Sequence, residues 1–208
     1  MAVHVLYGSS SGLTVTGNQF WHQDSPDIEE RAEAGDRFGA ALAAGNFDGF
    51  SCADLAIGVP SEDFDDNVPV ISESGAVTII YSQTDSGLTA SGIPSDQFFH
   101  QNTSGVDDTA EAADRFGSTL TAGDFSGDGA ADLAIGVPFE DVINNSGANT
   151  QDAGQVQVLY GIPRTSTCCP LSVTIGGLTT TNDQVWHQDV TGILDTVEAN
   201  DRFGSALY

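Results

Sequence analysis

The sequence contains very few basic residues and no lysine. Its 208 residues include 30 Asp and Glu against 5 basic residues, all of them arginine, and the formal net charge is −25. A chain of this composition has no basic stripe that could follow a phosphate backbone or an anionic membrane surface. The composition therefore argues against nucleic acid as a partner. It favours surroundings rich in cations, such as extracellular calcium or high salt.

Long apolar segments are also missing. No apolar run approaches the roughly 20 residues that a membrane-spanning helix needs, so we expect no membrane insertion. Residues 1–8 alternate like a strand and lack the basic and apolar regions of a signal peptide. If the protein is exported, we expect the signal to lie outside this chain.

Cysteine is scarce as well. Of the three cysteines, Cys168 and Cys169 are adjacent and Cys52 is far away in sequence, and three cysteines do not make a disulfide framework. We expect small buried or reduced thiols, with one bridge from Cys52 as the alternative.

What the sequence has in abundance is glycine, with 24 residues, between short apolar runs. This combination is typical of an all-β protein. Three elements recur in a fixed order: an aromatic-His-Gln element, Asp-Arg-Phe-Gly, and Asp-Leu-Ala-Ile-Gly-Val-Pro. The Asp-Arg-Phe-Gly copies begin at Asp36, Asp114 and Asp201. Recurrence at this period indicates a repeat architecture.

Each repeat unit is predicted to hold four short antiparallel strands, as in a propeller blade. The predicted fold is all-β, with four-stranded antiparallel blades of the β-propeller type in an incomplete ring of about two full blades plus partial ones. In the second unit we expect strands at residues 116–123, 132–137, 155–160 and 184–188. We predict one domain over residues 1–208, made of a partial blade with strands three and four (1–35), a first full repeat (36–113), a second full repeat (114–200) and the first strand of a further repeat (201–208).

The loop between the first two strands of the second unit has the spacing of a metal-binding loop. Oxygen side chains stand at positions 1, 3, 5 and 9 and glycine at position 6, which lets a short loop wrap around a hard cation. The apolar run that follows, ended by Gly and Pro, is typical of a strand rather than a helix. Three aspartates in one tight loop repel one another without a cation, which favours calcium over a bare acidic turn. The oxygen-bearing residues are Asp124, Ser126, Asp128 and Asp132.

These motifs resemble the FG-GAP repeat of integrin alpha-subunit β-propellers and their bacterial relatives. The match rests on Phe-Gly at the start of each unit and Gly-Val-Pro after the aspartate loop, and it covers nearly the whole chain. The resemblance implies a ring of about seven four-stranded blades, with calcium held between strands one and two. The implied calcium ligands are Asp124, Ser126, Asp128, Ala130 through its carbonyl, and Asp132.

The corresponding loop of the first unit departs from this pattern. Phe50 stands at position 5 and Ser51 replaces the glycine, whereas Asn46, Asp48 and Asp54 remain. Loss of one carboxylate and of the bend glycine weakens cation binding. We therefore predict a weakly occupied or empty site in this loop.

Other repeated features are predicted to be structural. His22, His100 and His187 occupy the same place in three units, which suits one repeated strand-end hydrogen bond better than a shared metal or catalytic site. The arginine of each Asp-Arg-Phe-Gly copy is predicted to pair with carboxylates between blades. The acidic loops 61–74 and 139–153 are predicted to be solvated, with a second cation site or a binding surface as the alternative.

The sequence contains no nucleophile elbow, zinc spacing or phosphate loop, so we predict no enzymatic activity. It predicts a calcium-binding module, extracellular or at the cell surface, that presents a protein-interaction or adhesion surface to other protein chains, including copies of itself. One alternative is a structural subunit whose incomplete blades join copies into a filament or layer. A second alternative is an accessory domain of a secreted hydrolase. Oligomeric state discriminates between the module and the structural subunit.

Overall fold

The computed structural model describes residues 1–50, 52–64, 69–84, 86–168 and 171–208, and it describes side chains for these residues except 166–168 and 171–173. All regular elements among the described residues are strands, which confirms the all-β prediction. Within the same ranges no helix is long and apolar enough to cross a bilayer. In chain order the strands are β1 (Val3–Ser9), β2 (Gly12–Trp21), β3 (Ala41–Gly45), β4 (Asp54–Val59), β5 (Ala76–Gln83), β6 (Gly87–Thr89), β7 (Gln97–Phe99), β8 (Thr119–Gly123), β9 (Asp132–Val137), β10 (Val142–Ile143), β11 (Asn149–Thr150), β12 (Gln155–Ile162), β13 (Thr165–Cys168), β14 (Leu171–Thr174) and β15 (Gly177–Trp186).

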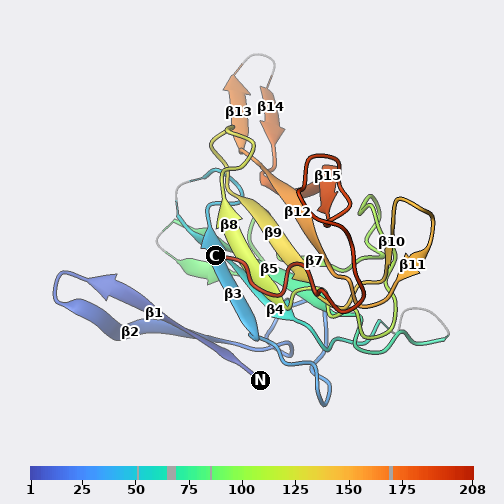
Figure 1. Cartoon of the computed structure of the whole chain (residues 1–208). Coiled ribbons are helices and arrows are strands. Elements are labelled where there is room, and N and C mark those ends of the chain that lie inside the picture. Colours follow the sequence, from blue (N-terminus) through green and yellow to red (C-terminus); the bar gives the residue numbers. More distant parts are fainter. Residues whose placement is uncertain (51, 65–68, 85, 169–170) are drawn as a thin grey trace.

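The second unit forms one four-stranded antiparallel sheet in the order β15-β12-β9-β8 (Figure 1). The sheet lies inside the predicted unit 114–200, and β9 has the predicted bounds. The fourth strand differs from the prediction, because β15 begins at Gly177 rather than near Gln184. Its register against β12 shifts between Val158 and Tyr160. Such a bulge breaks the side-chain alternation, which hid the first half of this strand from sequence patterning.

The first unit repeats this arrangement with one variation. Strands β3, β4 and β5 pair in order, and both β6 and β7 pair with β5. Strands β6 (87–89) and β7 (97–99) pair with β5 as the single strand β15 pairs with β12. The first unit therefore has a loop between two short strands where β15 has a bulge. The β1–β2 pair carries a register shift at the corresponding point, between Val5 and Tyr7.

Three further parts of the chain show where the strand predictions fail. Residues 201–208 form turns and no strand, in contrast to the predicted first strand of a further repeat. No described strand runs beside them, and a strand needs a hydrogen-bonded neighbour. Phe203 and Leu207 pack instead against Val156 and Val158 of β12. The hairpins β10–β11 and β13–β14 were not predicted.

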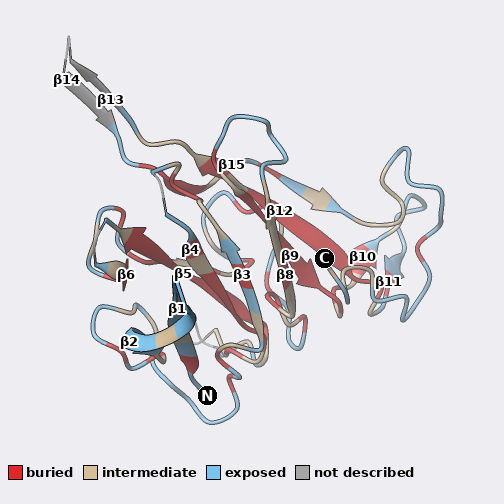
Figure 2. Cartoon of the chain, turned by 90° about the vertical axis from the view of Figure 1, so that its left-hand side faces the viewer, coloured by how far each residue is buried: buried red, intermediate tan, exposed pale blue. Residues whose placement is uncertain are grey.

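The two full sheets share one apolar core. It joins Val77 and Ile79 of β5 to Leu133 and Ile135 of β9 and to Phe116. Figure 2 shows the buried residues concentrated on the central strands of both sheets. Burial of both sheet faces explains why Asp-Leu-Ala-Ile-Gly-Val reads as a continuous apolar run rather than an alternating one.

The glycines of the repeated motifs let neighbouring units approach at backbone distance. A Cβ on Gly58, in the first Gly-Val-Pro, would stand 2.1 Å from the carbonyl oxygen of Gly117 in the following Phe-Gly. A Cβ on Gly136 would stand 2.2 Å from the carbonyl oxygen of Gly204. Only glycine allows this contact, so the two motifs are the two halves of one blade-to-blade junction.

Candidate cation-binding loop and blade interface

The loop from Asp124 to Asp132 joins β8 to β9, and the carboxylate of Asp124 organises its first half. Asp124 Oδ1 accepts hydrogen bonds from the N–H groups of Gly127 (2.7 Å) and Asp128 (3.0 Å), and Oδ2 accepts one from Gly129 (3.2 Å). Gly127 and Gly129 have φ angles of +78° and +96°, which favour glycine. The backbone is thereby wrapped around this carboxylate.

Asp132 has different surroundings, because its carboxylate is fully buried. Oδ2 accepts hydrogen bonds from the N–H groups of Phe125 (2.7 Å) and Ser126 (2.8 Å). Oδ1 accepts one from Gly161 of β12 at 2.9 Å. Asp132 therefore ties the loop and the third strand to the start of β9, a structural role that the ligand spacing alone did not reveal.

The oxygen atoms of this loop suit a hard cation in chemical type. Calcium binds carboxylate, hydroxyl and carbonyl oxygens, and a carboxylate offers about four lone-pair sites, so the three N–H donors on Asp124 do not exhaust it. Ser126 and Asp128 are exposed, and Asp128 Oδ1 accepts the N–H of Ala130 at 2.9 Å. Among the described residues, however, no three His, Cys, Asp or Glu side chains are gathered in a metal-binding arrangement. The donors are present but not preassembled around one point.

The loop of the first unit keeps the anchoring aspartate. Asp54 Oδ2 accepts the N–H of Phe47 (2.8 Å) and Oδ1 accepts the N–H of Ser82 (2.8 Å), as Asp132 does with Phe125 and Gly161. Burial raises the pKa of Asp54 to about 6; the hydrogen bonds from Ser82 and Phe47 oppose this shift and the charge of Asp48 adds to it. The anchor is thus common to both units.

The remaining positions of this loop differ from the second unit. Asn46 Oδ1 and Asp48 Oδ1 each accept the N–H of Phe50 at 2.9 Å. The Phe50 ring packs against Arg164, whose guanidinium carbon lies 4.6 Å from the ring centroid. Asp48 is 1% exposed, and its Oδ2 has no hydrogen-bond partner among the described residues. Phe50, with its contact to Arg164, therefore stands at the position that Asp128 holds in the second loop. The buried Asp48 Oδ2 has no hydrogen-bond donor among the described residues.

Two buried Glu–Gln pairs with the same spacing connect consecutive units. Gln23 Nε2 donates to Glu62 Oε2 (2.7 Å), and Gln101 Nε2 donates to Glu140 Oε2 (2.5 Å). Burial, reinforced by neighbouring carboxylates, raises the pKa of Glu62 to about 8 and that of Glu140 to about 9, from an ordinary value of 4.5. The folded protein therefore holds protons on both side chains at pH values where the unfolded chain releases them.

This linkage predicts a pH dependence of stability. Because the folded-state pKa values are raised, the stabilisation is complete below about pH 4.5 and is lost as the pH rises through about 8 and 9. We expect the melting temperature to fall between about pH 5 and about pH 9. In a Glu62→Gln, Glu140→Gln double variant, which mimics the protonated pair, the part of this fall above about pH 7 should disappear. The part below about pH 7 should remain, because burial also raises the pKa values of Asp54 and Asp96 to about 6 and that of Asp114 to about 7. Thermal denaturation, monitored by circular dichroism, measures the melting temperature of the wild type and of the double variant at each pH. An equal fall of the melting temperature above about pH 7 in both proteins would contradict the assignment of the raised pKa values to Glu62 and Glu140.

Tyrosines in β1 and β5 make a further connection between units. Tyr81 Oη donates to Gln97 Oε1 and accepts the N–H of Leu178 in the next unit at 3.0 Å. Tyr7 makes the same pair of contacts with Gln19 and with the N–H of Leu88. The recurrence of tyrosine at the end of the third-strand motif is the sequence signal that could have revealed this connection.

The motif arginines lie at the same junctions. Arg115 Nη2 lies 2.8 Å from Glu73 Oε2 of the preceding unit, which confirms the predicted carboxylate pairing for this residue. The guanidinium groups of Arg115 and Arg202 both contact the ring of Phe139, at 4.8 and 4.7 Å from its centroid. Arg202 therefore has an aromatic partner, and no ion pair with the predicted carboxylate is formed within the described ranges.

The repeated histidines begin turns at strand ends. The N–H of His22 donates to Ser25 Oγ and that of His100 to Thr103 Oγ1, at 2.9 Å in both cases. The predicted strand-end hydrogen bond is confirmed at these two positions, although it uses the main chain rather than the imidazole. Cys52 is exposed rather than buried. The side chain of Cys168 and the whole of Cys169 lie outside the described residues.

Two known groups of proteins are similar to this chain. The model of the FG-GAP repeat matches residues 116–159, which include β8, the Asp124–Asp132 loop, β9 and most of β12. The chain is also similar to integrin alpha-PS2 of Drosophila melanogaster, with 30% identity over 132 residues. That alignment covers 63% of this chain and 8% of the integrin chain, so this chain matches only a small part of its relative. The repeated blades, their glycine junctions and both similarities support an FG-GAP repeat protein.

Proposed function

We propose that this protein is a non-catalytic, extracellular calcium-binding module that presents a protein-interaction or adhesion surface. The observation that carries this proposal is the oxygen-lined loop between β8 and β9, fixed to two strands through Asp132 and open to solvent at Ser126 and Asp128. Similarity to an integrin alpha chain supports an interaction role. The large negative charge suits cation-rich surroundings outside the cell.

Calcium would be held by residues of this loop alone: Asp124, Ser126, Asp128, the carbonyl of Ala130, and Asp132. The ion would supply positive charge that offsets the repulsion between the aspartates and would fix the loop in one conformation. A fixed loop presents a defined surface to a partner at a lower entropic cost than a mobile one.

Calcium titration calorimetry tests the metal part of this proposal. We expect saturable binding near one equivalent, with a Kd on the order of 10⁻⁴ M as in other extracellular calcium modules. Asp124→Ala should weaken binding by at least about tenfold because it removes a carboxylate ligand. Asn46→Ala, at the same position of the first loop, is the matched control and should bind like the wild type. Absence of calcium binding by the wild type, or equal binding by Asp124→Ala, would overturn the assignment.

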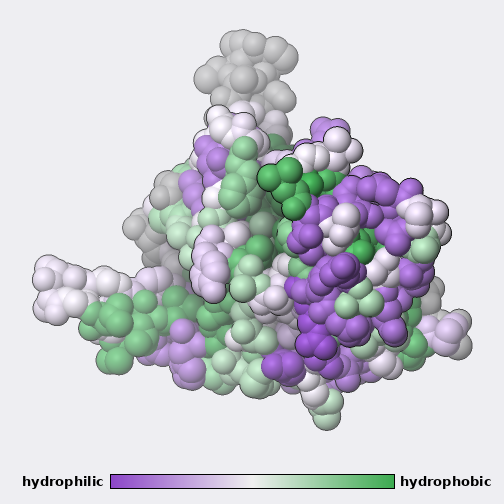
Figure 3. Space-filling view, viewed as in Figure 1, coloured by the Kyte–Doolittle hydropathy of each residue, from purple (hydrophilic) through white to green (hydrophobic). Residues whose placement is uncertain are grey.

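A second candidate, a structural subunit that joins copies of itself, is favoured by the N-terminal ribbon. Among the described strands β1 pairs only with β2, whereas β5 and β12 pair on both sides. The ribbon exposes Leu6, Leu13 and Val15. In Figure 3 the projecting ribbon carries an apolar patch behind a paler tip. An unpaired edge with exposed apolar side chains favours association. Light scattering with electron microscopy separates the two candidates: a discrete small particle supports the interaction module, and ordered polymers support the structural subunit.

A further inference from the structure

The N-terminal ribbon β1–β2 corresponds to the third and fourth strands of a full unit. The register of β1 against β2 shifts between Val5 and Tyr7, as that of β12 against β15 shifts between Val158 and Tyr160. Tyr7 Oη accepts the N–H of Leu88, which joins the ribbon to the first unit. The ribbon is therefore seated against the first unit as the outer half of a blade.

The free edge of β1 is the edge at which a full unit places its second strand. At this edge β5 pairs with β4 and β12 pairs with β9, whereas β1 pairs only with β2 among the described strands. Leu6 of β1 is 45% exposed, and Ile80, which holds the same position in β5, is fully buried. An open edge with uncovered apolar side chains can accept a further strand.

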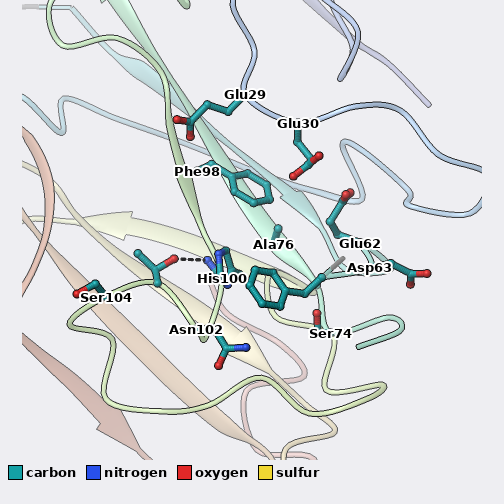
Figure 4. Close-up of a pocket in the computed structure, with 13 residues that line it drawn as sticks. Glu29, Glu30, Glu62, Asp63, Ser74, Ala76, Phe98, His100, Asn102 and Ser104 are labelled. Atoms are coloured by element: carbon teal, nitrogen blue, oxygen red, sulfur yellow. Dashed lines mark hydrogen bonds between the residues drawn. The ribbon is translucent and has the colours of Figure 1, made fainter. Parts of the chain in front are cut away.

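Two cavities of about 560 Å³ lie against the first unit, and their linings differ. One is lined by several carboxylates, among them Glu30 and Glu62 (Figure 4). The other lies beside β1 and is lined mainly by apolar side chains from β1, β3, β4 and β6. They include Val5, Ala44, Leu55 and Leu88. The cavity beside β1 therefore suits an apolar occupant.

The junction between the two full units shows which side chain fills the corresponding space. When the repeats are aligned, the equivalent residues are Ile79, Ala122, Leu133 and Leu178. They lie in or against one buried cluster that also contains Phe47. The loop that carries Phe47 is fixed there by the carbonyl of Asn46, which accepts the N–H of Ala131 at 2.8 Å. An aromatic ring from the loop between strands one and two thus closes this junction.

The first unit is uncovered at the positions that this junction buries in the second. Leu42 is 49% exposed, whereas the equivalent Leu120 is 8% exposed. Leu55 is only partly buried, whereas Leu133 is fully buried. The exposed apolar area is the area that strands one and two of a preceding blade would cover, and its burial favours association.

We propose that the free edge of β1 and the apolar cavity beside it bind a β-hairpin of a partner protein. One strand of the hairpin would pair with Val3–Leu6, as β4 pairs with Val77–Ile80 of β5. The hairpin loop would place an aromatic side chain in the cavity, as the first unit places Phe47 in the next junction. This proposal rests on the proposed interaction role, for which it names the class of partner, and it does not involve calcium.

A second folded copy of this chain does not offer such a hairpin. Its β3–β4 and β8–β9 hairpins are already paired, β4 with β5 and β9 with β12. Withdrawing either hairpin would break a ladder of backbone hydrogen bonds and uncover the core that the two units share. The partner is therefore a chain whose hairpin, of the same kind as β3–β4, has no third strand of its own.

A synthetic peptide of residues 36–60, with Cys52 replaced by serine, is the probe, because it holds both strands and the loop with Phe47. Fluorescence anisotropy of the labelled peptide, titrated with the full chain, measures binding. Salt at about 0.15 M screens the repulsion between the two acidic chains. We expect saturable binding of one equivalent. A peptide with Phe47→Ala should bind at least about tenfold more weakly.

Ala44→Trp in the full chain tests the cavity, because Ala44 is exposed and the added ring would fill the space that it lines. We expect at least about tenfold weaker binding of the wild-type peptide. Ala148→Trp is the matched control. It adds the same ring on the exposed β10–β11 hairpin, on the opposite side of the molecule from β1 in Figure 1, and should not change binding. Circular dichroism checks that each variant is folded.

The proposal is overturned by absence of peptide binding, by equal binding of the two peptides, or by equal binding to the wild type and Ala44→Trp. Sedimentation of the proteins alone tests a different occupant. Wild-type oligomers that Ala44→Trp dissociates would place a second copy in the cavity and would also overturn the proposal. Calcium titration of the same samples is a separate measurement. Loss of peptide binding with calcium binding intact therefore contradicts the docking site alone.

Discussion

Asp132→Ala is expected to lower the free energy of unfolding by about 3–5 kcal/mol, because it removes a buried carboxylate and leaves three N–H groups without their acceptor. The N–H groups of Phe125, Ser126 and Gly161 all donate to this one carboxylate. Water cannot replace the lost oxygens readily, since Asp132 is fully buried. Urea denaturation in the presence of a calcium chelator measures the structural effect without any contribution from the metal.

Asp124→Ala is the matched control, because it removes the same chemical group from the other end of the loop. Asp124 is exposed, so solvent can take over its three N–H contacts, and the cost should be about 1 kcal/mol. A large loss for Asp132 and a small loss for Asp124 would show that Asp132 also anchors the fold, whereas Asp124 matters mainly for the loop. Equal losses would contradict this division of roles.

Phe47→Ala is expected to cost about 3–5 kcal/mol, the range for removing a fully buried phenylalanine. Phe47 is fully buried in the core that both sheets share. It belongs to the first unit but packs in the same cluster as Leu133 and Leu159 of the second. Its loss should therefore weaken both units at once, as a single cooperative unfolding transition at lower denaturant concentration.

Phe125→Ala provides the comparison for Phe47, because the two residues hold the second position of their respective loops. Phe125 is 53% exposed, and its truncation should cost about 0.5 kcal/mol or less. Similar losses for the two variants would contradict the shared core. Two separate transitions in Phe47→Ala would show that the units are independently stable.

Repetition made the fold predictable from the sequence, and local irregularity limited the prediction. The identical Asp-Leu-Ala-Ile-Gly-Val segments fixed β4 and β9, because both strands are buried on both faces and carry a continuous apolar signal. The first half of β15 escaped detection because a bulge interrupts its alternation. The two-residue strands β10 and β11 are too short to show any period.

The candidate site was only partly predictable for a different reason. The spacing from Asp124 to Asp132 identifies the oxygen-bearing side chains of the loop, and their role as calcium ligands stays a prediction. It could not show that Asp132 accepts a hydrogen bond from Gly161, which lies 29 residues away in sequence.

Calcium is proposed to organise the Asp124–Asp132 loop between two strands of the second blade, and amide hydrogen exchange with and without calcium tests this proposal. We expect calcium to slow exchange at the amides of Gly127, Gly129 and Ala130. Exchange at the core strands β4 and β9 should stay the same. The corresponding amides of the first loop should change little. Unchanged exchange in the Asp124–Asp132 loop at saturating calcium would contradict the claim, as would a change spread evenly over the whole chain.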